Sequence, residues 1–139
     1  MGIEENKAIK SRWYEEVFNK RNLTMVDEFI HPDWVGHSPD GQESNLEDLK
    51  QEAAMMLAAF PDLHITLEDI IAEDDKVVTR CTNRGTHTGG DYRGIAPTGK
   101  QFNMSSNVIS RIKGGKIVEC WGIDDQLGMM QQLGVIPTN

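Results

Sequence analysis

Several classes of protein are excluded by what this chain of 139 residues lacks. It has only two cysteines, Cys81 and Cys120, so a disulfide framework does not hold it together. Its longest apolar run, Ala53 to Phe60, is far shorter than the ~20 residues that cross a membrane as a helix. The polar and acidic start of the chain shows no secretory signal. We therefore expect a protein of the reducing cytoplasm.

Basic charge is also scarce. The chain has 14 Lys and Arg against 22 Asp and Glu, which gives a net charge of −8. Binding to nucleic acid or to an anionic membrane requires a concentration of basic residues, so we expect neither partner. The length is close to that of one typical domain. We expect a single domain over residues 1–139.

Three helices are predicted in the first 60 residues. Apolar side chains recur about every four positions between residues 4 and 22, which indicates an amphipathic helix. A capping box at Thr24 predicts a short second helix that ends near Pro32. A second capping box at Asn45 predicts a third helix, which Pro61 ends.

After the third helix the apolar period changes to two. The alternation predicts strands over residues 63–72, 77–87, 100–113 and 116–124. A Gly-Gly pair at 114–115 is typical of a hairpin, and a last short helix ends at Gly134. Helices followed by consecutive strands predict an α+β protein, with a curved antiparallel sheet wrapped around helices. The open end of such a sheet is a common place for a ligand cavity.

Two apparent motifs do not predict nucleotide or metal binding. Residues Gly94 to Lys100 match part of a phosphate-binding loop, but Gln101 stands where that loop needs Ser or Thr. A strand also follows this segment, where the motif requires a helix. The histidines show none of the spacings of a metal site, so no metal is expected.

His87 is predicted to point toward the interior. It shares a strand face with Cys81, whereas Arg80 and Arg84 occupy the opposite and solvated face. The residues alone leave two interpretations open. His87 is either a core histidine satisfied by one hydrogen bond or a group that lines a functional site.

Asp125 is the strongest candidate for acid–base chemistry. It shares a parity with Ile117, Trp121 and Ile123, so it follows an apolar face to the end of its strand. Loss of hydration there would raise the pKa of the carboxyl and suit it to proton transfer near neutral pH. The alternative is a helix cap formed by Asp124 or Asp125. The two carboxylates could also divide these roles.

Four segments occur in a fixed order along the chain. They are FIHPDWVGHSP at 29–39, GTHTG at 85–89, GIAPTGK at 94–100, and RIKGGKIVECW with DDQLGMMQQLG within 111–134. In order and spacing they resemble the SnoaL-like polyketide (ester) cyclases of the nuclear-transport-factor-like superfamily, from about residue 8 to residue 135. The resemblance implies a cone-shaped, cystatin-like α+β barrel with a deep apolar pocket, no cofactor, and assembly as a homodimer or homotetramer.

The resemblance also implies an activity. In such cyclases an aspartate before the terminal Q-L-G segment is the general acid/base for an intramolecular aldol ring closure of an apolar carbonyl substrate, and this position falls on Asp125. His87 and His37 are the further catalytic candidates. The alternatives are a non-catalytic small-molecule-binding module, or a hydrolase, isomerase or hydroxylase with the same pocket. The predicted substrate-binding residues are Trp34, Met56, Phe60, Tyr92, Phe102, Ser106, Asn107 and Trp121.

Overall fold

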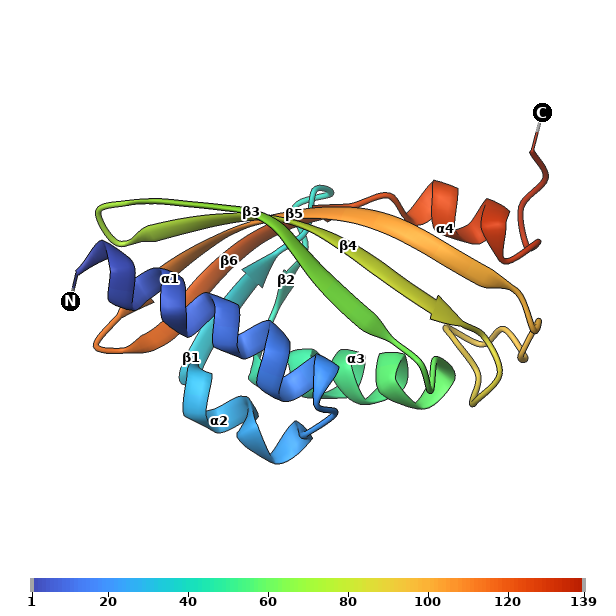
Figure 1. Cartoon of the computed structure of the whole chain (residues 1–139), viewed down its shortest axis with the longest axis horizontal. Coiled ribbons are helices and arrows are strands. Elements are labelled where there is room, and N and C mark those ends of the chain that lie inside the picture. The colour runs from blue at the N-terminus through green and yellow to red at the C-terminus, as the bar shows by residue number, and fades with distance from the viewer. Residues whose placement is uncertain (1, 139) are drawn as a thin grey trace.

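The computed structural model describes residues 2–138, which form a curved six-stranded sheet with the first three helices on its concave side. The strands lie in the order β2-β1-β6-β5-β4-β3, so β3 to β6 form a meander. Figure 1 shows how the sheet arches over the helices. The strands are β1 (Ile30–His37), β2 (Glu43–Ser44), β3 (His64–Glu73), β4 (Lys76–Thr86), β5 (Gln101–Lys113) and β6 (Lys116–Asp124).

Helices form the second layer. The first, α1 (Ile3–Arg12), continues as a π-helical segment, η1 (Trp13–Asn19). A 3₁₀ turn, η2 (Leu23–Met25), leads into α2 (Val26–Phe29). The next helix is α3 (Leu46–Ala59), and a last one, α4 (Gln126–Gln132), lies at the far end of the sheet (Figure 1). None of the described helices is long and apolar enough to cross a membrane.

The capping box predicted at Asn45 is confirmed. The Asn45 side chain accepts a hydrogen bond from the backbone N–H of Asp48, and the Asp48 carboxylate accepts one from the N–H of Asn45, both at 2.9 Å. The box predicted at Thr24 differs, because the Asn22 side chain caps that turn instead. The predicted second helix is also shorter than expected.

The α+β class and the curved sheet are confirmed, but the sheet is not antiparallel throughout. The segment around Pro32, predicted to end a helix, belongs to β1, which pairs with β6 in parallel. Its register is interrupted between Ile30 and Val35. Pro32 lies in this gap, where its missing N–H costs no ladder hydrogen bond.

A β-bulge in β6 changes which side chains face the concave side. Arg111 pairs with Glu119, but the next residue of β5, Ile112, pairs with Ile117, so Val118 is an extra residue. One extra residue reverses the alternation along the rest of a strand. The predicted common face of Ile117, Trp121 and Asp125 is therefore wrong.

Two apolar clusters form the core. The first packs η1 and α2 against the sheet. It contains Trp13, Val17 and Phe29 of the helical layer and Trp34 of β1. The second lies between the end of α3, the β4–β5 loop and α4. It contains Phe60, Tyr92, Phe102, Met129 and Leu133.

Candidate functional site

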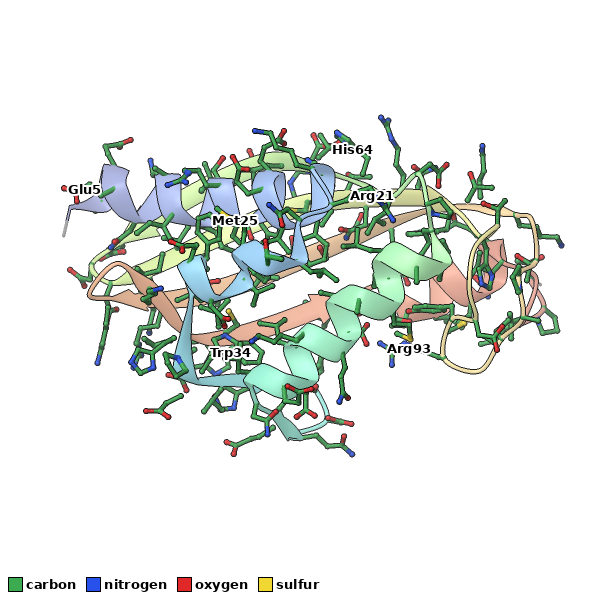
Figure 2. The ribbon with its side chains drawn as sticks, turned by 90° about the horizontal axis from the view of Figure 1, so that it is seen from below. Glu5, Arg21, Met25, Trp34, His64 and Arg93 are labelled. Carbon is green, nitrogen blue, oxygen red and sulfur yellow. The ribbon has the colours of Figure 1, made fainter. Side chains whose placement is uncertain are left out.

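A cavity of about 870 Å³ lies between the concave face of the sheet and the helical layer. Its volume is typical of a small-molecule site. Figure 2 looks onto the helical side, with Trp34 and Arg93 labelled on opposite sides of α3. Most of the wall is apolar, and it includes Trp13, Phe18, Ile30, Trp34, Leu49, Met56, Leu63, Ile65, Met104 and Val108.

The rim of the cavity is polar. Exposed side chains of the β1–β2 loop, Asp40 and Gln42, contribute to it, as do Asp48 and Glu52 of α3. The cavity therefore opens to solvent between this loop and α3. An apolar interior with a few polar groups at the opening suits an apolar ligand that carries carbonyl or hydroxyl groups.

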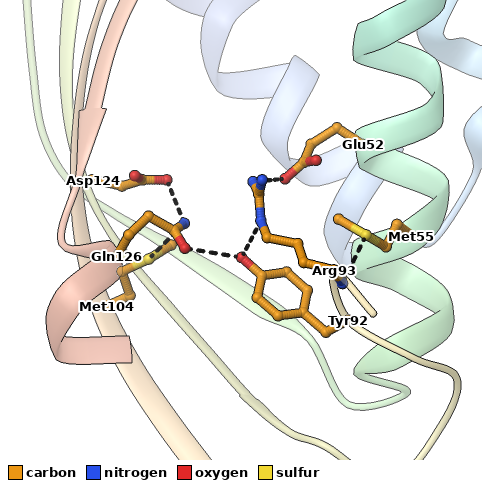
Figure 3. Close-up of polar contacts among 7 residues, drawn as sticks. All are labelled: Glu52, Met55, Tyr92, Arg93, Met104, Asp124 and Gln126. Carbon is orange, nitrogen blue, oxygen red and sulfur yellow. Dashed lines mark hydrogen bonds and ion pairs between the residues drawn. The ribbon is translucent and has the colours of Figure 1, made fainter. Parts of the chain in front are cut away.

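Asp124, the last residue of β6, is exposed and provides a carboxylate at the edge of the cavity that it lines. Its Oδ2 accepts a hydrogen bond from Gln126 Nε2 at 3.3 Å. The Gln126 carbonyl oxygen accepts one from the Tyr92 hydroxyl at 3.1 Å. The Arg93 Nε–H donates to the same hydroxyl at 3.0 Å, and Arg93 Nη2 pairs with Glu52 at 2.8 Å. Figure 3 shows this chain of contacts from β6 to α3.

Ser106 of β5 lies beside Asp124 on the same face, because the two residues are paired across the sheet. The Ser106 hydroxyl oxygen accepts a hydrogen bond from Asn83 Nδ2 at 3.0 Å, and Asn83 is buried and also lines the cavity. The hydroxyl proton of Ser106 is left to donate toward a ligand, because its oxygen is already the acceptor for Asn83.

These groups can move a proton and stabilise a negative oxygen. Asp124 has the carboxylate, Ser106 a hydroxyl donor, and Arg93 a cation in the same cavity. In the part of the chain that the structure describes, no three His, Cys, Asp or Glu side chains are arranged to hold a metal ion.

Four of the predicted site residues line the cavity: Trp34, Met56, Ser106 and His37. Trp34 is buried and donates its indole N–H to the sulfur of Cys120 at 3.5 Å. Met56 faces the cavity from α3.

The structure places Asp125 outside the cavity, as the N-cap of α4. Its Oδ1 accepts a hydrogen bond from the backbone N–H of Gly128 at 3.0 Å. Asp124 faces the cavity instead, because the bulge in β6 has reversed the alternation. The two carboxylates thus divide the roles that the sequence left open.

His87 is fully buried and does not line the cavity. Its Nδ1 accepts a hydrogen bond from the Thr98 N–H at 3.3 Å, so its Nε2 carries the proton and donates to the carbonyl of Gly90 at 3.0 Å. His87 therefore holds the two ends of the β4–β5 loop together. Of the two interpretations, the core histidine agrees with this geometry.

His37 lies at the rim, but its ring is held by groups of the outer face. Nε2 lies 2.7 Å from Glu119 Oε2, and Nδ1 lies 3.5 Å from a carboxylate oxygen of Glu43. The ring stacks on Trp121 with centroids 5.2 Å apart. Trp121 itself does not line the cavity, and Asn107 is exposed on the outer side of β5.

The remaining predicted aromatic residues form core rather than cavity wall. Phe60 packs against Phe102 with ring centroids 4.7 Å apart and against Tyr92 at 5.3 Å. All three are at most 1% exposed, and none lines the cavity. Tyr92 reaches the site only through its hydroxyl, in the contacts of Figure 3.

The family model of SnoaL-like polyketide cyclases matches residues 8–133. The chain belongs to this family. The match covers both the helical layer and the long strands of the sheet, so the cavity lies wholly within it.

Three solved structures are at least 30% identical to this chain over most of its length. IdmH of Streptomyces antibioticus, described as a candidate polyketide cyclase, is 36% identical to this chain, with coverage of 94% and 99% of the two chains and a TM-score of 0.80. A candidate polyketide cyclase of Acidithiobacillus ferrooxidans is 30% identical, with coverage of 96% and 98% and a TM-score of 0.79. AclR of Streptomyces galilaeus, described as a candidate hydroxylase, is 30% identical, with coverage of 99% and 86% and a TM-score of 0.89.

More distant similarity concerns the fold alone. A Catenulispora acidiphila protein with a ketosteroid isomerase-like fold is 15% identical, with coverage of 92% and 93% and a TM-score of 0.72. The comparison with curated proteins found no match.

For this SnoaL-like protein, the sequence did not single out Glu52, Asn83, Arg93 or Gln126. Asn83 had a usable signal, because it alternates with Cys81 on the predicted inner face of its strand. Arg93 had none, since it lies in an irregular loop at a positive φ of 49°. Only the fold brings it to Glu52, 41 residues earlier in the chain.

Proposed function

We propose that this protein is a polyketide cyclase that closes a ring in an apolar carbonyl substrate by an intramolecular aldol-type reaction. The observation that carries the proposal is Asp124, a carboxylate that lines a cavity with apolar walls and lies beside Ser106. Membership in the SnoaL-like family and the similarity to IdmH support the same reaction class.

The reaction uses one proton and needs no external reagent. Asp124 removes a proton from a carbon next to a carbonyl, and the resulting enolate carbon forms a bond to a second carbonyl carbon of the same molecule. The oxygen of that carbonyl becomes an alkoxide, which takes the proton back from Asp124. Ser106 and Arg93 donate hydrogen bonds to the oxygens on which negative charge develops.

The test uses a ketone whose exchange can be followed without knowledge of the native substrate. 2-Acetonylanthraquinone in D₂O reports proton removal through loss of its methylene signal in NMR. Asp124→Asn should lower the enzyme-dependent exchange rate by roughly 10²–10⁴, the usual contribution of a positioned acid–base group. Binding of the ketone should change little, because the amide has the size of the carboxylate.

Asp125→Asn is the matched control. It removes the neighbouring charge but keeps a side chain that can cap α4, so exchange should remain near that of the unmodified protein. The proposal is wrong if Asp125→Asn abolishes exchange while Asp124→Asn does not. Binding of the ketone without any exchange above the solvent rate would instead indicate a binding module.

Hydroxylation is the second candidate, because AclR is described as a candidate hydroxylase and shares 30% identity over 99% of this chain. The source of oxygen separates the reactions. Label from ¹⁸O₂ in the product indicates hydroxylation, whereas label from H₂¹⁸O at a cleaved ester or epoxide indicates hydrolysis. Ring closure by the aldol route incorporates neither at the new bond.

We also propose that the chain acts as a single domain in a homodimer. Apolar side chains lie next to one another across the outer face of the sheet, where Ile71 pairs with Val78, Val78 with Ile109, and Ile109 with Trp121. Ile71 is 65% exposed and Ile109 40%. A second copy would cover this row by a two-fold contact. Both cysteines are free, and we propose the reducing cytoplasm as the site of action.

A further inference from the structure

A buried lysine in the cavity takes no part in the reaction proposed above. Lys10 of α1 is only 3% exposed and lines the cavity. Among residues 2–138, no ion pair joins its ammonium group to a carboxylate. Every carboxylate that lines the cavity is thus engaged elsewhere or lies apart from Lys10.

The surroundings of Lys10 are neutral. Its Nζ lies 4.8 Å from the centroid of the Tyr14 ring, and the Tyr14 hydroxyl shares a hydrogen bond of 2.8 Å with Thr79 Oγ1. Burial raises the pKa of Tyr14, so the phenol keeps its proton at neutral pH. Burial opposes the charge of Lys10, whereas its contacts with the ring and hydroxyl of Tyr14 favour it, and on balance the pKa of Lys10 is raised from 10.5. Lys10 therefore keeps the positive charge of an ordinary lysine.

A buried cation without an anion is unfavourable. Removing an ammonium group from water costs more free energy than contact with one aromatic ring returns. The cost falls when a negatively charged oxygen enters the cavity, because a charge-assisted hydrogen bond then replaces the lost water. The position of Lys10 is thus suited to a ligand that brings its own negative charge.

Lys10 and Asp124 are separated across the sheet. Lys10 lies against Tyr14, whose hydroxyl is bonded to Thr79 of β4, whereas Asp124 belongs to β6. Strand β5 lies between them, and two strand spacings amount to roughly 10 Å. A ligand of two or three fused rings spans most of this distance.

We propose that Lys10 binds a carboxylate of the ligand at the end of the cavity away from Asp124, so that the ligand is a flat, apolar carboxylic acid. Its identity as a polyketide acid rests on the proposed function, whereas the carboxylate site rests on Lys10 alone. The reacting carbonyl groups then lie near Asp124, while the acid group fixes the orientation of the molecule.

The test compares two probes of the same shape, anthraquinone-2-carboxylate and anthraquinone-2-carboxamide. Quenching of tryptophan fluorescence reports binding, because Trp13 and Trp34 line the cavity. The unmodified protein should bind the carboxylate about tenfold more tightly than the amide, as expected for one charge-assisted hydrogen bond. Lys10→Met should remove this preference and leave the amide affinity unchanged or higher.

Lys7→Met is the control, because it removes the same charge from α1 at a side chain that pairs with Glu4 and does not line the cavity. It should keep the preference. Equal affinities in the unmodified protein overturn the proposal, and this measurement needs no folded variant. A preference that survives Lys10→Met and disappears in Arg93→Met also overturns it, since the carboxylate then lies at the rim.

This result is independent of catalysis. Asp124→Asn should keep the preference for the carboxylate whether or not it loses proton exchange. A preference for the carboxylate probe without proton exchange of the ketone therefore contradicts the proposed reaction only. Proton exchange without that preference contradicts the role of Lys10 only.

Discussion

Asp124 and Asp125 are neighbours with opposite surroundings. Asp124 ends β6 and faces the cavity, whereas Asp125 turns back and caps α4 through Gly128. The difference arises from one backbone step, because consecutive side chains of a strand point to opposite faces. A carboxylate held by a backbone N–H is a structural group, whereas Asp124 is held only by the Gln126 side chain and has one oxygen without such a contact.

Asp125→Ala should therefore affect stability rather than binding. Loss of an N-cap carboxylate lowers the free energy of unfolding by about 1 kcal/mol. Urea denaturation followed by circular dichroism measures this change, and Asp125→Asn should recover most of it. A large loss of proton exchange in a folded Asp125→Asn variant would contradict this structural role.

At the scale of elements, the β4–β5 loop caps the C-terminus of α3. The backbone N–H groups of Gly89 and Gly90 donate to the carbonyls of Ala59 and Ala58 at 3.0 Å and 2.9 Å. These carbonyls have no partner within the last turn of a helix. His87 closes the same loop from inside. The Gly-rich segment thus fixes the end of α3, the helix whose Glu52 and Met56 line the cavity.

Gly89→Ala tests this contact. A Cβ at Gly89 would collide with the carbonyl oxygen of Ala58, so the loop must move away and leave helix carbonyls unpaired. We expect a loss of about 1–3 kcal/mol in the free energy of unfolding. Gly90→Ala is the matched control, because its Cβ would meet its nearest neighbour at an ordinary 3.9 Å. Equal stability of the two variants in urea denaturation would contradict the role of the close approach.

The elements themselves were largely predictable from the sequence. The strands β3 to β6 follow from period-two alternation, and α3 from its capping box at Asn45. β1 was not predictable, because Pro32 interrupts its pattern and its partner lies far along the chain. The site was less predictable than the fold. The bulge at Val118 leaves no signal in the alternation, and it decides that Asp124 rather than Asp125 faces the cavity.

At the scale of the whole molecule, the outer face of the sheet is the surface that we expect a second copy to cover. Ile109→Glu puts a charge in the middle of the apolar row and should convert a dimer to a monomer. Size-exclusion chromatography with light scattering measures the mass. Ile3→Glu, at a side chain that is 43% exposed on α1, is the control and should leave the dimer intact. A monomeric unmodified protein would rule out the dimer.

The parallel pairing of β1 with β6 joins residues from Ile30 to His37 with residues from Ile117 to Trp121. During synthesis on the ribosome, the residues of β1 emerge long before their partner strand exists. Helix α3 can form from its own sequence, but the cavity cannot close until β6 has left the exit tunnel. Pairing across such a long stretch of chain is slow compared with local helix formation. A chain that ends before β6 therefore lacks the part of the cavity wall that carries Asp124.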